Sequence, residues 1–206
     1  KVPVILFSGG EPMAREDIFD MMAHAARLGA QPVLSSNGTL LTDEAVARLR
    51  EANVVRVGIS LDGMEDTNDR FRGKQGAFQD ALDGIRRCIE AGFRVSLRFT
   101  MTRHNVDELD DIFALAEREG IPRVCIYHLV YSGRGAKVAN IDLGPEERRR
   151  AVEFIFSRAL DFHRRGIHKD VLTVDNHSDA GHLVMWSQAN APHRPAEALS
   201  LLRRNG

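Results

Sequence analysis

Val4-Ile5-Leu6-Phe7-Ser8-Gly9-Gly10-Glu11-Pro12 reads as a short apolar strand that stops at two glycines and passes into a helix. Pro12 suits a first helical position, because its missing N–H costs little there. The two glycines let a ligand come close to the backbone, and Glu11 adds a carboxylate at the same place. Parallel α/β folds keep their sites at the carboxyl ends of strands. The stretch therefore predicts a strand–helix unit with a binding position at the junction.

The same alternation of strand and helix continues along the chain. Helical periodicity is clear in 18–28, 78–89 and 109–116, each followed by a glycine, and Thr42 and Asn105 are predicted helix N-caps. Repeats without hairpin signals predict parallel strands joined by right-handed crossovers. Runs rich in Val, Ile, Leu and Phe predict strands at 2–8, 32–36, 54–61, 94–102 and 123–130.

Two of these strands have one apolar and one polar face. In 55–62 and 95–102, apolar side chains alternate with Arg, Gly, Ser, Asp and Thr. Successive side chains of a strand point to opposite faces. A barrel with helices outside and a polar interior accounts for this pattern, and so does an edge strand with one solvated face. The alternation favours the barrel.

Composition excludes several classes of function. The 206 residues carry a formal net charge of −1, so no field attracts nucleic acid, and we expect no nucleic-acid partner. No apolar run approaches the ~20 residues that span a bilayer, so we expect no membrane partner. The two cysteines, Cys88 and Cys125, are too few for a disulfide framework or a metal site, which favours a cytoplasmic protein with both thiols in the core.

The character of the chain changes after Val130. A loop with Gly and Arg precedes a helix predicted from Pro145 to about Arg165, and a strand-like 171–174 and two short helical stretches follow. We expect a partial barrel in 1–143, and in 144–206 a helical continuation that begins a C-terminal region. Because residue 1 is not Met and strand-like sequence starts at once, we interpret the chain as a segment of a longer protein.

The strand–helix junction at Glu11 has two interpretations from local chemistry. Glycine carbonyls and a carboxylate form an acceptor-only cluster that suits an ammonium group. The structural alternative is a glycine-rich turn in which Glu11 complements the helix dipole. A phosphate site is disfavoured, because the carboxylate would repel the anion.

Five motifs in the same order resemble those of radical S-adenosylmethionine (SAM) enzymes. Gly9-Gly10-Glu11-Pro12 is similar to the GGEP motif of that family. The others are Ser36-Asn37-Gly38, Ser60-Leu61-Asp62-Gly63, Arg72-Gly73 with Phe78, and Asn105 with Leu109. Each one also has an ordinary structural explanation as a turn, a strand end or a helix cap. Together, in register, they identify the chain as a member of this family.

The resemblance implies a partial (β/α)6 radical SAM barrel, incomplete at both ends, with SAM as cofactor. Glu11 and the backbone of Gly9 and Gly10, followed by Pro12, would hold the amine of SAM. Ser60 and Asp62 would shape the nucleoside side, with Asn37 nearby. Arg98 lies on a polar strand face, where it would meet the carboxylate of SAM, a substrate acid or an ion-pair partner.

The family's iron–sulfur site is missing from this sequence. Radical SAM enzymes hold a 4Fe–4S cluster with a CxxxCxxC loop ahead of the GGEP strand, and no such loop occurs here. We therefore expect no metal ligand in this chain and no SAM cleavage by the chain alone. The cluster and an electron-donor protein would belong to the parent protein, and the sequence leaves its catalytic residues unknown.

Three further stretches, 127–135, 172–180 and 201–206, resemble the radical SAM family of heme d1 biosynthesis. That resemblance implies a parent that removes propionate side chains from a siroheme-derived tetrapyrrole. It also implies a second Fe–S cluster in a C-terminal region. Arg134, between two glycines, would bind propionates. His128 and His177 would position or ligate the tetrapyrrole or transfer protons; the alternative is a structural or surface role for each.

Two rival functions remain open at this point. One is a peptide-modifying radical SAM enzyme with a SPASM or twitch extension. The other is a catalytically inert fragment that binds partners or nothing. A tetrapyrrole retained on purification would separate the first interpretation from the peptide-modifying one.

Overall fold

The computed structural model describes residues 3–205, apart from the side chains of 133–135, 137, 201, 204 and 205. Its centre is one six-stranded sheet in which every pairing is parallel. The five strands predicted first are confirmed: four are shorter than predicted, the one predicted at 32–36 is one residue longer, and the strand-like 171–174 adds a sixth. The strands are β1 (Val4–Phe7), β2 (Gln31–Ser36), β3 (Arg56–Ser60), β4 (Arg94–Thr100), β5 (Arg123–Tyr127) and β6 (Asp170–Val174).

Helices connect successive strands, and the cues for them are local. The Thr42 side chain accepts a hydrogen bond from the Ala45 N–H at 3.2 Å, so the predicted cap is confirmed. The helices are α1 (Ile18–Arg27), α2 (Asp43–Glu51), α3 (Glu65–Arg72), α4 (Ala77–Glu90), α5 (Leu109–Arg118), α6 (Pro145–Arg164), α7 (Ser178–Asn190) and α8 (Pro195–Asn205). Short 3-10 segments are η1 (Pro12–Ala14), η2 (Val106–Glu108) and η3 (Gly133–Ile141).

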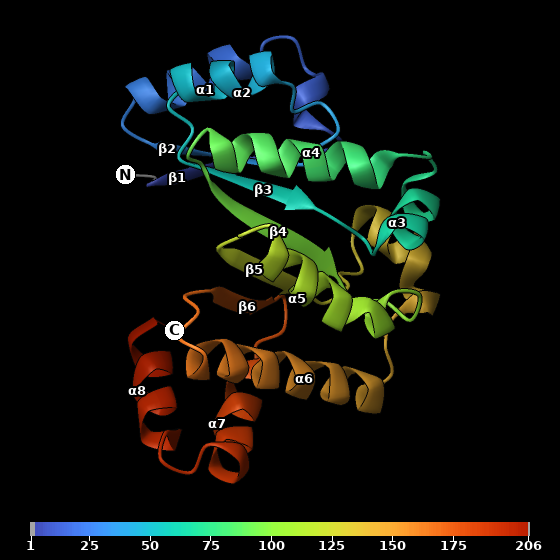
Figure 1. The fold of residues 1–206 in the computed structure, drawn as a ribbon, viewed down its shortest axis with the longest axis vertical. Coiled ribbons are helices and arrows are strands. Elements are labelled where there is room, and N and C mark those ends of the chain that lie inside the picture. The colour runs from blue at the N-terminus through green and yellow to red at the C-terminus, as the bar shows by residue number, and fades with distance from the viewer. Residues whose placement is uncertain (1–2, 206) are drawn as a thin grey trace.

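Strand order distinguishes the two folds that the sequence left open. The order is β1-β2-β3-β4-β5-β6, so each crossover moves one strand further in the same direction. A doubly wound sheet would reverse direction once and place helices on both faces. A single direction with right-handed crossovers keeps the connecting helices on one side, as in a barrel wall. Figure 1 shows strands and helices succeeding one another in this order, which confirms a partial α/β barrel.

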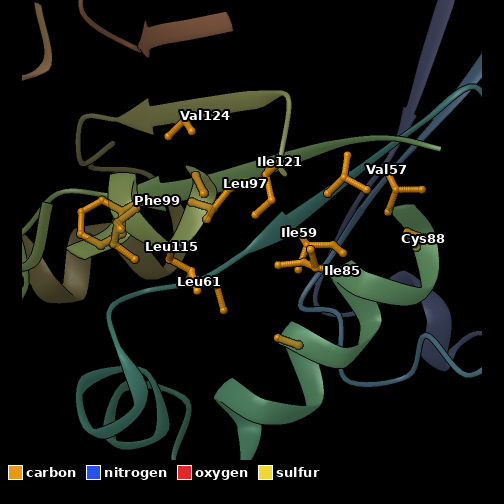
Figure 2. Close-up of a cluster of buried hydrophobic side chains, with 14 of the residues drawn as sticks. Val57, Ile59, Leu61, Ile85, Cys88, Leu97, Phe99, Leu115, Ile121 and Val124 are labelled. Atoms are coloured by element: carbon orange, nitrogen blue, oxygen red, sulfur yellow. The ribbon is translucent and has the colours of Figure 1, made fainter. Parts of the chain in front are cut away.

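The hydrophobic core lies between the sheet and its helices. Val57, Ile59, Leu97 and Phe99 are fully buried, as the alternation predicted. Figure 2 shows these strand residues beside Ile85 and other apolar side chains from the helices. The face that the alternation marked as polar therefore faces the concave side of the sheet.

The core is continuous across residue 143. Ala151, Ile155 and Phe162 of α6 belong to the same buried cluster as the strands, and the Phe162 ring lies 6.1 Å from that of Phe113. β6 pairs with β5 along its whole length. Helices α7 and α8 lie beyond α6 at the C-terminal end (Figure 1). The predicted boundary between 1–143 and 144–206 stays a prediction. Helix α6 and strand β6 are parts of the barrel wall.

One local prediction needs correction, and two concerning the cysteines are confirmed. Asn105 stands before η2, but its side chain makes no cap bond; it accepts from the Thr102 N–H instead and donates to the carbonyls of Asp62 and Thr100. Cys88 is buried in the core, as predicted. Cys125 is also buried, as predicted, and it lies on the concave face, because its neighbours Val124 and Ile126 face the helices.

Candidate functional site

The carboxyl ends of the strands meet along one edge of the sheet, since all pairings are parallel. This edge carries the ends of β1 through β5, and with them most of the residues that the motifs singled out. The two glycines after β1 are exposed, and a Cβ built on Gly9 or Gly10 meets no atom within 4 Å. Open space therefore borders the backbone where the sequence predicted a ligand.

The Glu11 carboxylate ties the end of β1 to the end of β2. Its Oε1 accepts hydrogen bonds from the Ser36 hydroxyl at 2.8 Å and the Met13 N–H at 3.1 Å. Its Oε2 accepts from the Asn37 N–H at 2.7 Å. A carboxylate offers about four acceptor positions. Three are used, so one remains for a ligand beside the exposed glycines.

The turn after β2 is fixed by its own side chain. Asn37 Oδ1 accepts from the N–H and the hydroxyl of Thr39, both at 2.9 Å. Gly38 has a φ of +83°, and a Cβ there would lie 2.8 Å from Ile59 Cγ2 and 3.0 Å from Ala81 Cα. Only glycine fits this position. The turn therefore presents the Asn37 N–H rigidly to Glu11.

The end of β3 is bound by a second network. Asp62 pairs with Arg72, Oδ2 to Nη2, at 2.7 Å; the Asp62 side chain is 13% exposed and that of Arg72 30%. Burial raises the pKa of Asp62 above its ordinary value, and the Arg72 guanidinium partly offsets that effect. The Asp62 N–H donates to Asn68 Oδ1, while its carbonyl accepts from Asn105. Ser60 lies half-buried beside this pair, and its carbonyl accepts from Arg72 at 3.3 Å.

Arg98 projects from β4 onto the concave face. Its Nη1 donates a hydrogen bond to the Ser35 hydroxyl, and its guanidinium carbon lies 5.4 Å from the centre of the Tyr127 ring. The side chain crosses Gly58 on the intervening strand, where a Cβ would lie 2.9 Å from Arg98 Nε. The missing side chain at Gly58 therefore makes room for Arg98.

The residues proposed for substrate are scattered. His128 follows β5, is only 7% exposed, and its Nε2 lies 2.7 Å from Asp179 Oδ2. This contact joins the end of β5 to the start of α7, and Asn176 donates to the other Asp179 oxygen at 2.9 Å. His177 is exposed and lines a cavity of about 960 Å³ between β6, α6, α7 and α8, away from the Glu11 turn. The side chain of Arg134 lies outside the described residues.

Residues 3–205 offer no ready metal site. Within that range no group of three or more His, Cys, Asp and Glu side chains is placed to hold a metal ion. Cys88 lies among the helices and Cys125 on the concave face, so the two thiols belong to different sides of the sheet. Burial raises the pKa of Cys88 to about 12. An iron–sulfur cluster does not fit the donors of this segment.

None of the described helices combines the length and the apolar character needed to cross a lipid bilayer.

Several contacts escaped the reasoning from sequence. Ser36 was noted only as part of a turn motif, yet it holds Glu11, while its neighbour Ser35 holds Arg98. Glu108 accepts from the Met64 N–H at 2.6 Å and from the Thr67 hydroxyl, so it fixes the start of α3 and not its own helix. Asp179 lies far from His128 in sequence. The sequence could have indicated only that Ser35 and Ser36 face opposite sides of the sheet, because adjacent residues of a pleated strand do so.

The chain matches the family model described as Radical SAM superfamily over residues 1–134. It is 49% identical over 203 residues to the Fe-coproporphyrin III synthase of Methanosarcina barkeri, covering 98% of this chain and 51% of that protein. It is 39% identical over 193 residues to the pre-heme d1 synthase of Dinoroseobacter shibae, covering 93% and 48%. The chain thus spans about half the length of these curated relatives.

Solved structures agree on the fold. SuiB of Streptococcus suis, bound to its precursor peptide SuiA, superposes with a TM-score of 0.70 at 17% identity, covering 87% of this chain and 39% of that one. The enzyme anSMEcpe with bound AdoMet and a peptide superposes with a TM-score of 0.68 at 16% identity, covering 82% and 49%. At such identities the likeness concerns the architecture alone.

Proposed function

Since the chain belongs to the radical SAM superfamily, we propose that it forms the SAM-binding barrel of an enzyme that modifies a tetrapyrrole. The observation that carries the first half is the Glu11 turn, with its acceptors and open space at the carboxyl edge of the sheet. The second half rests on the relatives named for heme d1, heme and Fe-coproporphyrin III synthesis.

The residues at the strand ends fit the amine of SAM. An ammonium group has three donors and no acceptor. The free acceptor position of Glu11 and the carbonyls of the exposed residues Gly9 and Gly10 would take these donors, while the buried Pro12 fixes the turn. Asn37, Ser60 and Asp62 would border the nucleoside, with Asp62 held in place by Arg72. When bound in an active enzyme of this family, SAM supplies a 5′-deoxyadenosyl radical.

The iron–sulfur chemistry belongs to other parts of the protein in this proposal. The sequence contains two cysteines, neither in a CxxxCxxC loop, so these 206 residues alone would not cleave SAM. The 4Fe–4S cluster, a second cluster and the contact for an electron donor would lie outside the segment. What this chain would contribute is the wall that holds SAM and encloses the substrate.

For the reaction, we propose loss of propionate side chains from a siroheme-derived tetrapyrrole, as in heme d1 synthesis. Arg134 would bind a propionate. His177 would contact the substrate from the start of α7, where it is exposed. His128 would take part only through Nδ1, because its Nε2 is held by Asp179.

A second product has its own support. The relative named Fe-coproporphyrin III synthase is 49% identical, against 39% for the pre-heme d1 synthase. Both names concern tetrapyrroles, so the two candidates share the class of compound and differ in the product. The relative whose name concerns a peptide, the PqqA peptide cyclase of Gluconobacter oxydans, is 33% identical over 178 residues.

Product analysis tests the proposal. The anaerobic full-length protein with its clusters, SAM and a reductant is incubated with a siroheme-derived tetrapyrrole, and the products are separated and weighed by mass spectrometry. Mass losses that match propionate removal support heme d1 chemistry, and a product identical to Fe-coproporphyrin III supports the second candidate. An unchanged tetrapyrrole, with SAM consumed only when a peptide is added, contradicts both.

A further inference from the structure

The charged residues of the sheet lie on one face. The six strands contain four arginines and one aspartate, which leaves a formal charge of +3, although the whole chain carries −1. All five side chains are on the concave face, because their strand neighbours, such as Val57, Val95 and Val124, are buried against the helices. The five are Arg56, Arg94, Arg98, Arg123 and Asp170.

Asp170 neutralises only one side of this face. Its Oδ2 lies 2.9 Å from Arg123 Nη2 and 3.6 Å from Arg94 Nη2. Arg56 and Arg98 meet no carboxylate at ion-pair distance among the side chains that the structure describes. Two guanidinium groups are therefore left with positive charge toward the interior of the barrel.

Both arginines border Gly58 on this face. Arg98 passes over Gly58, within 2.9 Å of where a Cβ would stand. Arg56 lies two residues before Gly58 on the same strand, so both side chains share one face. Like charges placed side by side destabilise one another unless an anion lies between or above them. A carboxylate bound on this face would balance the charge of both guanidinium groups.

Contacts within the protein hold the Arg98 side chain in position before any ligand binds. Ser35 accepts from one of its five N–H groups and Tyr127 lies beside it, so most of its donors stay available. Burial raises the pKa of the Cys125 thiol and of the Tyr127 phenol, so neither ionises near neutral pH to balance the charge. A planar fork held in this way binds a carboxylate with two hydrogen bonds.

We propose that Arg56 and Arg98 form a carboxylate-binding pair on the concave face, which holds an acidic side chain of the substrate inside the barrel. The inference rests on the proposed function for the identity of that substrate, a tetrapyrrole with several carboxylates. Arg98 then serves the substrate and not SAM. The pair orients the macrocycle by one acid group and leaves another facing the strand-end edge.

Binding measurements with the full-length protein test the pair. The probes are coproporphyrin III, which has four carboxylates, its tetramethyl ester, which has none, and citrate, which has three without the macrocycle. Arg56→Gln and Arg98→Gln are each expected to raise the Kd for coproporphyrin III about 10-fold or more, as the loss of a charge-assisted contact predicts. The ester binds weakly to every variant, and the Kd for SAM stays at the wild-type value.

Two further variants separate charge from position. Arg94→Gln removes an arginine of the same face that is 66% exposed and already shares Asp170, so binding is expected to stay near wild type. Gly58→Ala keeps every charge but places a methyl group against Arg98 Nε, so it is expected to weaken coproporphyrin III binding as Arg98→Gln does. Thermal unfolding of each variant checks that the fold is kept, and Arg98→Lys provides a milder change.

The outcomes separate this inference from the proposed function. Wild-type binding by both glutamine variants overturns the pair, even if the enzyme converts tetrapyrroles. Weakened SAM binding in Arg98→Gln with unchanged porphyrin binding overturns it too. If the wild type ignores coproporphyrin III but binds citrate through these arginines, the pair stands and the tetrapyrrole proposal fails. Binding of neither probe rejects the pair.

Discussion

At the residue scale, the Glu11 carboxylate holds the strand ends together, and the same carboxylate is the group proposed to bind SAM. Its carboxylate receives three hydrogen bonds from two strand ends and a helix start. Such bonds to a charged acceptor are worth about 1.5–3 kcal/mol each when broken. The residue therefore organises the edge on which we place SAM, and its partner Ser36 allows the two tasks to be separated.

Ser36→Ala is expected to lower the free energy of unfolding by about 1–3 kcal/mol, since it removes one donor from Glu11 in a buried place. SAM binding should weaken only modestly, because the carboxylate keeps its other two partners. Denaturant unfolding and calorimetric titration of SAM measure the two effects. A normal stability would show that the Ser36 hydroxyl does not bond to Glu11 in solution.

Asp62 gives a dependence on pH with a defined sign. Burial raises its pKa in the folded state, so the folded protein holds this proton more tightly than the unfolded chain does. The resulting stabilisation is complete below the ordinary carboxyl pKa and is lost as pH rises through the raised value. Asp62→Asn stays neutral, so its stability relative to wild type should increase over that interval.

Urea unfolding of wild type and Asp62→Asn across that pH interval measures the difference. Asp17→Asn is the control of opposite sign. The exposed Asp17 has its pKa lowered by a hydrogen bond from Arg15, so its contribution is present above the ordinary pKa and lost as pH falls. If Asp62→Asn changed with pH in the same direction as Asp17→Asn, the burial argument would be wrong.

Gly38 tests how tightly the Asn37 turn is built. Gly38→Ala must place a Cβ 2.8 Å from Ile59 Cγ2 and 3.0 Å from the Ala81 backbone, at a φ of +83°. Gly92→Ala has nearly the same φ, +82°, with no atom within 4 Å, and should cost only the ~1–2 kcal/mol of left-handed backbone. Overpacking adds about 1–3 kcal/mol for Gly38. Equal midpoints in urea would contradict the packing at Gly38.

At the scale of elements, the alternation of apolar and polar residues predicted which side chains of a strand are buried better than it predicted where the strand ends. Val57, Ile59, Leu97 and Phe99 face the helices because burial on one face fixes the register. Four of the five strands were predicted too long: β3, for example, ends at Ser60, although the Leu61 N–H still donates to the Arg98 carbonyl on β4 at 2.9 Å. Side-chain composition indicates which residues are buried, and burial extends past the last residue of the strand, as at the fully buried Leu61.

The residues of the candidate site also divide into those that the sequence could reveal and those that it could not. Glu11 and the motif positions could be found because they occur in short local patterns. Their partners could not, since Ser36 lies 25 residues from Glu11, and Asp179 lies 51 residues from His128. Asn105 shows the converse error: a residue typical of helix caps bonds to two strand ends instead. Long-range bonds of this kind depend on the register of the sheet, which local sequence does not encode.

Helix α6 allows a test of whether residues 144–206 share one hydrophobic core with the barrel. Phe162 is 1% exposed, packs against Phe113 and belongs to the core of the sheet. Phe162→Ala should therefore cost about 3–5 kcal/mol. Calorimetry should show one unfolding transition, shifted as a whole to lower temperature. Two transitions, of which only one moves, would indicate that 144–206 unfolds separately from the barrel, as a strict division at 143 requires.

At the scale of the molecule, the two faces and the carboxyl edge of the sheet have different roles. The convex face is apolar and holds the helices, the carboxyl edge carries the Glu11 turn, and the concave face carries the unneutralised arginines. Such a wall can hold a cofactor at its edge and an acidic substrate inside. Because the chain spans about half the length of its relatives, the remaining chemistry is proposed for the rest of the parent protein.

The central claim is that the Glu11 edge binds SAM, and calorimetric titration of SAM into the anaerobic full-length protein tests it most directly. Glu11→Ala, compared with wild type and with the exposed Glu16→Ala as control, should raise the Kd for SAM about 10-fold or more, because a charge-assisted contact to the amine is lost. Thermal unfolding shows what share of protein is folded at the titration temperature. Folded Glu11→Ala protein that binds SAM as tightly as wild type would contradict the account.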